Sequence, residues 1–324
     1  MSVEITFMVL LVALLFDAAF GYPDVVYRKI GHPVTWIGAL IDYLDARLNR
    51  SELNFADRKR NGIVALVFII GMPFASGLIL QSLISDTWIG TFALAAIAST
   101  FIASRSLHDH VHDVATALNT NGLDGARNAV ARIVGRDPQA LDEHDVARAA
   151  IESLAENASD GVVAPVFWFA LLGLPGLAAY KAINTADSMI GHRTARHEAF
   201  GWAAARLDDI VNVPASRLTG LLFAMAAVFM NGTSARKAMT TMLRDAPKHR
   251  SPNAGWPEAA MAGALDLKLN GPRSYDGKMI DDAYMGDGRR DASTTDIYTA
   301  LRLATTAWIL MTAIIAALLL IART

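Results

Sequence analysis

Two carboxylates, Glu156 and Asp160, stand four residues apart in the stretch SLAENASDGVVAP, with the amide of Asn157 between them. On a helix they share one face with Glu152, and like charges in this arrangement repel unless a cation lies among them. An apolar run begins at Val162, so this face is not solvated along its whole length. We interpret Glu156 and Asp160 as catalytic and metal-binding candidates and Asn157 as substrate-binding. A solvated helix face is the alternative.

A second polar stripe follows the same apolar run, in YKAINTADSMIGHR. Lys181, Asn184, Thr185 and Ser188 recur at three- and four-residue spacing, which places them on one helix face, with Asp187 on its flank. Lys181 offers a point charge to phosphate, and Asp187 is a candidate Mg²⁺ ligand and catalytic residue. Asn184 and Ser188 are candidates for substrate or phosphate binding. Anchoring at the membrane interface explains Lys181 but not the other polar residues.

Polar residues also crowd the stretch FGWAAARLDDIVNVPASR, namely Arg206, Asp208, Asp209, Asn212 and Arg217. From this group we take Arg206 as a candidate phosphate-binding cation and Asp209 as a catalytic candidate. A structural salt-bridge network is the alternative.

The stretch HRSPNAGWPEAAMAGAL carries Asn253 and Glu258, which are substrate-binding candidates. Pro257 suits the first position of a helix and Asn253 suits a nearby cap, so a purely structural helix start is the alternative. His32 and His110 are further candidates for contact with phosphate. Alternation of histidines at 108, 110 and 112 spreads the rings around a helix, so we expect no three-histidine metal site.

A standard nucleotide-binding fold is not predicted. GPRSYDGK resembles a phosphate loop, but the spacing from Gly271 to Gly277 is one residue too long, and Met279 stands where Ser or Thr is needed. No G-x-G-x-x-G motif is present.

The composition indicates a membrane protein with polar loops. The chain of 324 residues is 53% hydrophobic and 19% charged, with a mean hydropathy of +0.32. These values are too apolar for an ordinary soluble domain and too charged for a chain buried wholly in lipid. A net charge of −2 gives no indication of a nucleic-acid partner. The absence of cysteine excludes disulfides, thiolate catalysis and zinc–cysteine sites.

The apolar runs and helical periodicity predict an all-α, polytopic integral membrane protein with helical cytoplasmic loops and no run of strands. It would form a single membrane-embedded catalytic unit over residues 1–324. Four spans are expected near residues 3–20, 62–84, 88–104 and 303–322, the second and third joined by a tight turn at 85–87. Two apolar segments are ambiguous, 162–180 with its GLPG break and the short 218–230. Outside the spans, helices are expected over 107–118, 123–134 and 142–156, with a GRDP turn after the second.

The distribution of Lys and Arg predicts the orientation. The 21–61 loop is rich in basic residues, whereas the N-terminus and the 85–87 turn have none, so the N-terminus is expected outside and this loop in the cytoplasm. We favour a re-entrant 162–180 segment over a full span, because it keeps the basic segment 181–217 in the cytoplasm, where we place the active site.

Taken together, the motifs resemble the adenosylcobinamide-phosphate synthase family, the CobD/CbiB family of cobalamin biosynthesis. Tyr22 departs from the pattern, because Gly-Tyr-Pro stands where the family has Gly-Asp-Pro, and no acidic residue is present there unless Asp24 takes its place. The matching stretches are Asp17 with Gly21 and Pro23, HPVTWIG (32–38), ESLAENASDGVVAP (152–165), YKAINTADSMIG (180–191), FGWAAARLDDIVNVPASRL (200–218), SPNAGWPEAAMAGAL (251–265) and GPRSYDG (271–277).

The resemblance implies an inner-membrane enzyme that joins a propionate carboxyl of adenosylcobyric acid to the amine of aminopropanol phosphate, using ATP and Mg²⁺. The carboxyl must be activated, most simply as an acyl phosphate, before an amine attacks it. That chemistry requires acidic residues to hold Mg²⁺, cations to offset phosphate charge, and a base for the incoming ammonium. The implied partners are these substrates, the lipid bilayer and other late corrinoid-assembly membrane enzymes, with no nucleic acid.

Two other function classes stay open. One is a Mg²⁺-dependent membrane phosphotransferase, although its D-x-x-D-G-x-x-A-R pattern is absent because no Ala-Arg follows Asp160 and Gly161 at the required spacing. The other is a non-catalytic transporter or regulatory membrane protein. A transporter is expected to show paired broken helices in inverted halves, and the sequence shows one clear break.

Overall fold

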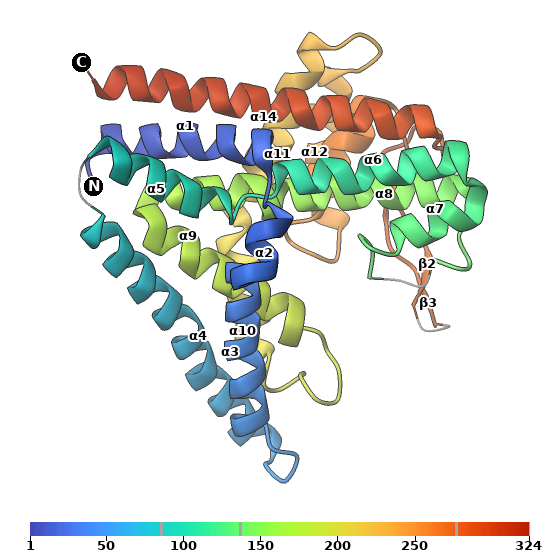
Figure 1. The fold of residues 1–324 in the computed structure, drawn as a ribbon. Coiled ribbons are helices and arrows are strands. Elements are labelled where there is room, and N and C mark those ends of the chain that lie inside the picture. Colours follow the sequence, from blue (N-terminus) through green and yellow to red (C-terminus); the bar gives the residue numbers. More distant parts are fainter. Residues whose placement is uncertain (85–86, 136–137, 276–277, 324) are drawn as a thin grey trace. The chain divides into compact units, whose positions relative to one another are not determined.

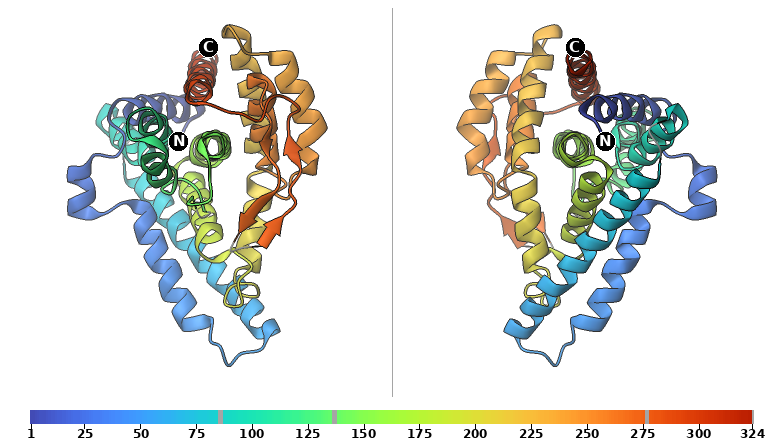
Figure 2. Two further views of the ribbon diagram at one scale, coloured as in Figure 1. Left: turned by 90° about the vertical axis from the view of Figure 1, so that its right-hand side faces the viewer. Right: turned by 90° about the vertical axis from the view of Figure 1, so that its left-hand side faces the viewer.

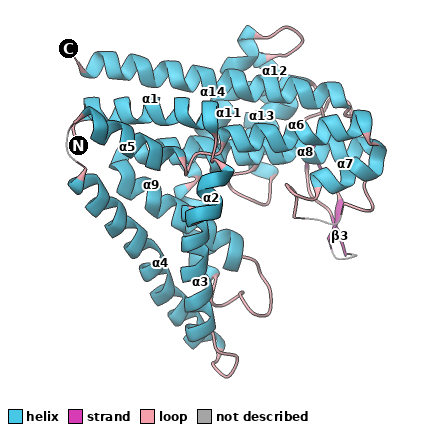
Figure 3. Cartoon of the chain, in the orientation of Figure 1, coloured by secondary structure: helices cyan, strands magenta, loops and turns pink. Residues whose placement is uncertain are grey.

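The computed structural model describes residues 1–84, 87–135, 138–275 and 278–323, and helices make up most of them (Figure 3). The chain divides into two compact units. The first comprises Met1–Ala103, Ala164–Asn212 and Ile315–Thr324, and the second comprises Ser104–Val163 and Val213–Ile314. The single catalytic unit expected over residues 1–324 stays a prediction. The division into two compact units does not show which parts of the chain take part in catalysis.

The first unit is wholly helical in its described part (Figure 1). It includes the C-terminal end of α14, a long helix that begins in the second unit. Its elements are α1 (Val3–Phe20), α2 (Asp24–Ile30), α3 (Pro33–Leu48), α4 (Phe55–Leu83), α5 (Trp88–Ser99), α9 (Ala164–Ile190), α10 (Trp202–Val211) and the end of α14 (Thr294–Ala322).

The second unit is also helical, with two small two-stranded sheets. Strands β1 and β4 pair antiparallel, as do β2 and β3. Its helices are α6 (Ser104–Thr120), α7 (Gly122–Val130), α8 (Glu143–Ala158), the π-helix η1 (Ser159–Val163), α11 (Val213–Ala226), η2 (Ala227–Phe229), α12 (Ala235–Asp245), η3 (Ala246–Lys248), α13 (Gly255–Leu265) and the start of α14; its strands are β1 (Leu269–Asn270), β2 (Arg273–Tyr275), β3 (Lys278–Ile280) and β4 (Tyr284–Met285).

The fold class predicted from the sequence is confirmed. By length and composition, five helical stretches of the described chain can cross a membrane, or six if Trp202–Val211 and Val213–Phe229 count as one broken span. The five are Val3–Phe20, Phe55–Leu83, Trp88–Thr120, Glu143–Ile190 and Thr294–Ala322. Large apolar side chains on these helices are exposed, such as Val67 at 65% and Ile89 at 83%. Such faces suit contact with lipid rather than water.

Some predicted boundaries shift for local reasons. The second predicted span begins earlier, at Phe55, because the Asn54 side chain caps the helix by accepting a hydrogen bond from the Asp57 amide at 2.9 Å. The third ends at Ser99, and α6 starts separately at Ser104. Several predictions lie outside the described residues: the turn at 85–86, the GRDP turn at 136–137, the end of GPRSYDG at 276–277 and the side chain of Asp24.

The GLPG sequence breaks α9, as predicted. Gly173 has φ +67° and ψ −155°, a conformation that glycine adopts without strain. The break frees the Leu174 amide, which donates to Oε1 of Gln81 on α4 at 3.0 Å. Gly77 of α4 packs against Pro175, where an added Cβ would come within 2.9 Å of the proline Cα. Figure 2 shows α4 and α9 next to each other. A side chain of α4 therefore satisfies the backbone that the break exposes.

In the second unit, the buried carboxylate of Asp245 links α12, η3 and β4. It accepts from Arg244 at 2.6 and 2.9 Å, from Lys248 at 2.7 Å and from the Gly286 amide at 3.0 Å. Burial alone would raise the pKa of Asp245, but these hydrogen bonds outweigh it and hold the pKa at about 2. The carboxylate therefore stays ionised in the folded protein well below its ordinary range.

Replacement of Gln81 tests the support of the broken helix. Gln81→Leu leaves the buried Leu174 amide without its acceptor, so we expect a loss of about 1–3 kcal/mol of stability. Thermal unfolding of the detergent-solubilised chain, followed by tryptophan fluorescence, measures this loss. Ser82→Ala is the matched control, because the Ser82 hydroxyl is exposed and donates only to Ile79 O. Equal midpoints for the two variants would contradict the assigned role of Gln81.

Asp245→Asn tests the buried carboxylate through pH. The folded pKa lies below the ordinary value, so its stabilisation is complete above about pH 4 and is lost as pH falls toward 2. We expect the variant to be about 2 kcal/mol less stable than the parent at pH 7, and the difference to shrink below pH 4. Unfolding midpoints of both proteins across this range measure it. A difference that does not change with pH would contradict the assignment.

Candidate functional site

In the first unit, the second half of α9 lies against α10 and brings polar groups together. The Asp208 carboxylate accepts through Oδ2 from Nδ2 of Asn212 at 2.9 Å. Asn212 in turn accepts through Oδ1 from the Tyr180 hydroxyl at 2.9 Å. Tyr180 and Asn212 are each only 1% exposed. This chain of hydrogen bonds starts in the core and fixes the orientation of Asp208.

Two carboxylates meet at this point. Asp187 of α9 interacts electrostatically with Asp208, and the Asn184 amide lies beside the Asp208 carboxylate. The second oxygen of Asp208, Oδ1, is buried, and it accepts no hydrogen bond of ordinary geometry from the residues that the structure describes. A buried carboxylate that interacts with another acid is costly unless a cation or a proton neutralises the pair.

This donor set fits Mg²⁺. That ion takes oxygen ligands, and proteins usually hold it through one or two carboxylates while water and substrate phosphates supply the rest. Asp187 and Asp208 supply two carboxylates, and the Asn184 side chain lies beside Asp208. In the ranges that the structure describes, no group of three or more His, Asp or Glu side chains could hold a metal ion. The metal site expected at Glu156, Asp160 and Asp187 stays a prediction.

The end of α9 leaves space for the Asp187 carboxylate. Gly191 follows it by four residues and donates its amide to the Asp187 carbonyl at 2.8 Å. A Cβ at Gly191 would overlap with Oδ1 of Asp187. Further along, a Cβ at Gly201 would overlap with the carbonyl of Ile190, and one at Gly62 of α4 with that of Phe200. The loop over residues 191–201 is thus pressed closely against α4 and the end of α9.

Helix α3 holds the same loop from another side. Asp45 accepts from Nε of Arg196 at 3.0 Å and from Asn49 at 2.7 Å, and Asn49 donates also to the Arg196 carbonyl at 3.0 Å. Burial would raise the pKa of Asp45, but the hydrogen bonds from Asn49 and Arg196 outweigh it and leave the pKa below its ordinary value. Asp45 therefore stays ionised and holds the loop that follows Asp187.

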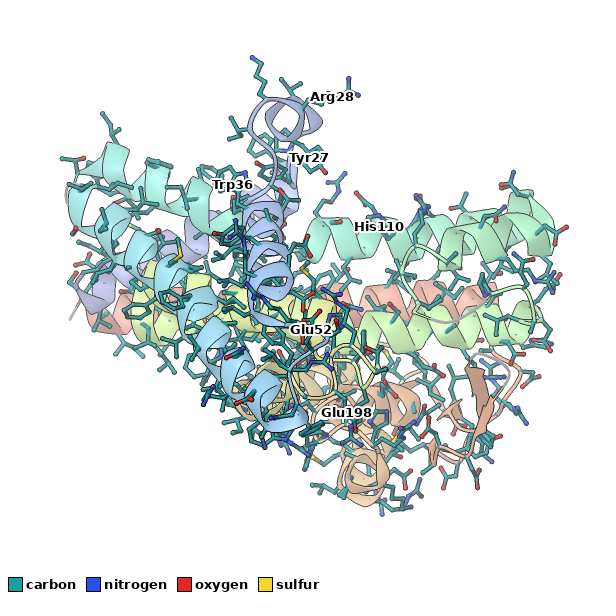
Figure 4. The ribbon with its side chains drawn as sticks, turned by 90° about the horizontal axis from the view of Figure 1, so that it is seen from below. Tyr27, Arg28, Trp36, Glu52, His110 and Glu198 are labelled. Atoms are coloured by element: carbon teal, nitrogen blue, oxygen red, sulfur yellow. The ribbon has the colours of Figure 1, made fainter. Side chains whose placement is uncertain are left out.

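His32 and Lys181 lie close enough to interact. His32 caps α3: its Nδ1 accepts from the Val34 amide at 3.1 Å. Burial lowers the pKa of His32, and the charge of Lys181 lowers it further. The turn before α3 is fixed by Trp36, labelled in Figure 4, whose indole donates to Ile30 O at 2.9 Å. Tyr22, the departure from the family pattern, donates to Gly31 O at 2.6 Å.

The remaining predicted residues of the first unit have local contacts. Arg206 lies 3.4 Å from Oδ2 of Asp209, which is the salt bridge given as the alternative to phosphate binding. The guanidinium is more than half exposed, so the pair contributes little to stability and leaves Arg206 accessible. Ser188 donates to the Asn184 carbonyl at 3.0 Å. Roles of these residues in substrate binding stay predictions.

In the second unit, Asn253 holds an arginine that the sequence-based prediction left out. Arg217 donates to Oδ1 of Asn253 and to the hydroxyl of Ser216, both at 2.9 Å. Its guanidinium lies 4.5 Å from the ring centre of Trp256. Asn253 itself is only 7% exposed. An arginine oriented in this way by neutral groups is well suited to bind phosphate or carboxylate.

Glu258, in the first turn of α13, pairs with a histidine. Nε2 of His249 lies 3.7 Å from Oε2 of Glu258, and Nδ1 of His249 accepts from the Ser251 amide at 3.0 Å. Glu258 is 4% exposed. The two side chains form an acid–imidazole pair in which Glu258 is buried and His249 is half-buried.

The stretch that carries Glu156, Asn157 and Asp160 contains a π-helix. Helix α8 gives way at Ser159 to η1, and this extra residue in the turn changes the direction of the side chains that follow. Glu156 and Asn157 are exposed and Asp160 is half-buried. π-Helical turns of this kind occur frequently at functional sites.

Glu152 behaves differently from its acidic neighbours on α8. It is 7% exposed, and its Oε1 accepts from the Asn270 amide at 2.7 Å, so it anchors β1. The acidic face read from the sequence therefore divides into a structural residue and the candidates Glu156 and Asp160.

Comparison with known proteins gives a match over nearly the whole chain. The CobD/Cbib protein family matches residues 10–304. The chain belongs to the CobD/Cbib family. It is 50% identical over 297 residues to the cobalamin biosynthesis protein CobD of Sinorhizobium sp, covering 91% of this chain and 92% of that one.

Two more relatives carry the same name. The CobD of Rhodobacter capsulatus is 50% identical over 308 residues, with 94% of this chain and 95% of the relative covered. The CobD of Brucella suis is 47% identical over 317 residues, with 97% of each covered. No solved structure matches the chain. All the candidate site residues fall within the part that the family matches.

The structure brings out four residues that the sequence-based prediction left out of the site. These are Asp208, Asn212 and Tyr180 in the first unit, and Arg217 in the second. A sequence signal existed for one pair, because Asp208 and Asn212 are four residues apart and face each other on a helix. Tyr180 and Arg217 make contacts with residues 32 and 36 positions away, which no local spacing reveals.

Gly191→Ala tests the space reserved for Asp187. The added methyl group would displace the carboxylate, so we expect affinity for Mn²⁺, a spectroscopically visible substitute for Mg²⁺, to fall by about tenfold or more. Electron paramagnetic resonance of free Mn²⁺ measures this. Gly71→Ala is the matched control, because a Cβ there meets nothing within 4 Å. Unchanged Mn²⁺ affinity in Gly191→Ala would contradict the arrangement.

Proposed function

We propose that the chain is an acid–amine ligase of cobalamin biosynthesis. It joins a propionate carboxyl of adenosylcobyric acid to the amine of aminopropanol phosphate and gives adenosylcobinamide phosphate, with ATP and Mg²⁺. The observation that carries the proposal is the family match over residues 10–304, with relatives named for cobalamin biosynthesis at about half identity.

The acidic pair of the first unit supports a metal-dependent reaction. Asp187 and Asp208, with Asn184, would hold Mg²⁺, and the ion when bound would offset negative charge on the phosphates of ATP. The Tyr180–Asn212 hydrogen bonds keep Asp208 in place, and the loop over residues 191–201 keeps Asp187 in place. These side chains are therefore positioned before any ligand arrives, which is what electrostatic stabilisation of a developing charge requires.

Cations of both units are suited to the phosphate groups. Lys181 supplies a point charge beside His32, and Arg206 is exposed. In the second unit, Arg217 is held by Asn253 and Trp256 and can grip two oxygens of one group. A ligase that handles two phosphorylated species needs several such groups.

The incoming ammonium must lose a proton before its nitrogen attacks. Asp209 is a candidate for this base, because it lies next to Asp208 in the sequence and its side chain is 35% exposed. Glu156 and Asp160, at the π-helix of the second unit, are the other catalytic candidates.

The apolar helices make the chain a membrane protein, and we propose the inner membrane as its location. The N-terminus would lie outside and the loop over 21–61 in the cytoplasm, as the positive-inside rule indicates. The active site would then face the soluble substrates. Other late corrinoid-assembly enzymes of the membrane are proposed neighbours.

The reaction is tested with the purified full chain in detergent. Given adenosylcobyric acid, aminopropanol phosphate, ATP and Mg²⁺, it is expected to consume ATP and form the amide in equal amounts, measured by chromatography and mass spectrometry. Asp208→Asn removes one of the two paired charges and is expected to cut turnover by about a hundredfold or more.

Asp124→Asn is the control for this assay, because the Asp124 side chain is 91% exposed on α7 and far less constrained. Amide formation without ATP consumption, or no reaction with either substrate, would contradict the ligase. A phosphotransferase would instead transfer a phosphate-containing group to an alcohol. A transporter would leave both substrates chemically unchanged.

A further inference from the structure

A cavity of about 810 Å³ lies in the second unit. Helix α6 supplies His108 and His112, and the first half of α14 supplies Tyr298 and Arg302. Asn231, after η2, completes its polar wall. None of these residues has a role in the proposed reaction.

Arg302 gives the described lining of the cavity a permanent positive charge. Among the described residues that line it there is no Asp or Glu. The guanidinium of Arg302 is exposed and donates to the hydroxyl of Thr299 at 3.2 Å. An arginine bordering a cavity with only a neutral neighbour is suited to an anion, because its remaining N–H groups match the oxygens of phosphate.

The two histidines present a second set of polar atoms. Their rings are nearly parallel, with an interplanar angle of 14° and centroids 6.1 Å apart. Nδ1 of His108 lies 3.4 Å from Asp109, and Nδ1 of His112 lies 3.4 Å from Thr116 Oγ1. These contacts occupy one nitrogen of each ring, so Nε2 of each ring is left for a ligand. A bound anion favours the protonated imidazole, in which Nε2 donates.

The position of the cavity along α14 indicates which group the ligand carries besides its anion. Arg302 directly precedes Leu303, where the last long apolar run begins. From this position we expect Arg302 at the level where lipid headgroups meet the hydrocarbon, and basic pockets between helices at that level bind anionic headgroups. Met230, Leu301 and the Tyr298 ring add apolar surface to the same cavity. The ring of Tyr298 meets His112 edge-on, with centroids 5.8 Å apart.

We propose that this cavity binds a phosphate ester, with Arg302 and the two histidines on the phosphate oxygens and the apolar residues against the attached carbon chain. Two sources share this chemistry, the headgroup of an anionic phospholipid and a small soluble phosphate ester. The position beside Leu303 makes the lipid the expected source. The proposal does not depend on the ligase reaction, because it concerns binding and not turnover.

Titration of the purified, delipidated full chain in detergent tests the proposal. Phosphatidylglycerol is compared with diacylglycerol of the same acyl chains, and glycerol 3-phosphate with sodium chloride at equal ionic strength. Binding is measured by native mass spectrometry for the lipids and by calorimetry for the soluble ester. We expect phosphatidylglycerol to bind and diacylglycerol not to bind. Arg302→Gln is expected to weaken binding by about tenfold or more.

Two further variants make the result specific. The double variant His108→Gln with His112→Gln is expected to weaken binding in the same way. Arg236→Gln, an exposed arginine of α12 outside the cavity, is expected to leave binding unchanged. Binding of glycerol 3-phosphate alone, with the same dependence on Arg302, supports the site with a soluble ligand.

The opposite results overturn the proposal. These are binding of neither phosphate probe, equal binding of diacylglycerol and phosphatidylglycerol, or variants at Arg302 and the histidines that bind as well as the parent. The unfolding midpoint of each ligand-free variant is measured in parallel. If Arg302→Gln has a lowered unfolding midpoint, Arg302→Lys is measured in its place. Full affinity both in Arg302→Lys and in the histidine double variant then also overturns the proposal.

Discussion

Repulsion between Asp187 and Asp208 is the constraint on which the first unit depends. Two carboxylates that repel each other, one of them with a buried oxygen, raise the free energy of the folded chain unless something neutralises them. The surrounding structure holds both in place instead of letting them separate. Tyr180 and Asn212 fix one, and the closely packed loop after Gly191 fixes the other. Carboxylates held near each other in this way are typical of a functional site that can bind a cation.

The scaffold behind this pair follows from the break in α9. The GLPG sequence ends one helical segment and starts the next, and Gln81 of α4 takes over the amide that the break exposes. The second segment then carries Lys181, Asn184 and Asp187 on consecutive turns. Helix α3 contributes through Asp45, which holds Arg196 of the following loop, so three elements distant in sequence determine the position of one carboxylate. This arrangement agrees with the metal-dependent reaction that we propose for this member of the CobD/Cbib family.

Much of the fold could be predicted because its signals are local. The apolar run over Val3–Phe20, the GLPG break and the amphipathic α6 and α8 all follow from composition and three- to four-residue periodicity. The π-helix at Ser159 could not be predicted, because one extra residue in a turn leaves no change in apolar spacing that distinguishes it from an α-helix. Glu152 was grouped with Glu156 and Asp160 because the three are four residues apart, yet it anchors β1. For the site, Asp187 was predicted from its neighbours, whereas Asp208 became distinct from Asp209 only once Tyr180 and Asn212 were located.

The central claim is that Asp187 and Asp208 share one divalent cation, and a double-mutant cycle tests it most directly. Mn²⁺ affinity of the full chain in detergent is measured by electron paramagnetic resonance for Asp187→Asn, Asp208→Asn and the double variant. If both carboxylates hold the same ion, the losses are strongly non-additive, and the double variant binds scarcely more weakly than either single variant. Losses that add independently, or a parent chain that binds Mn²⁺ no better than the double variant, would contradict the account.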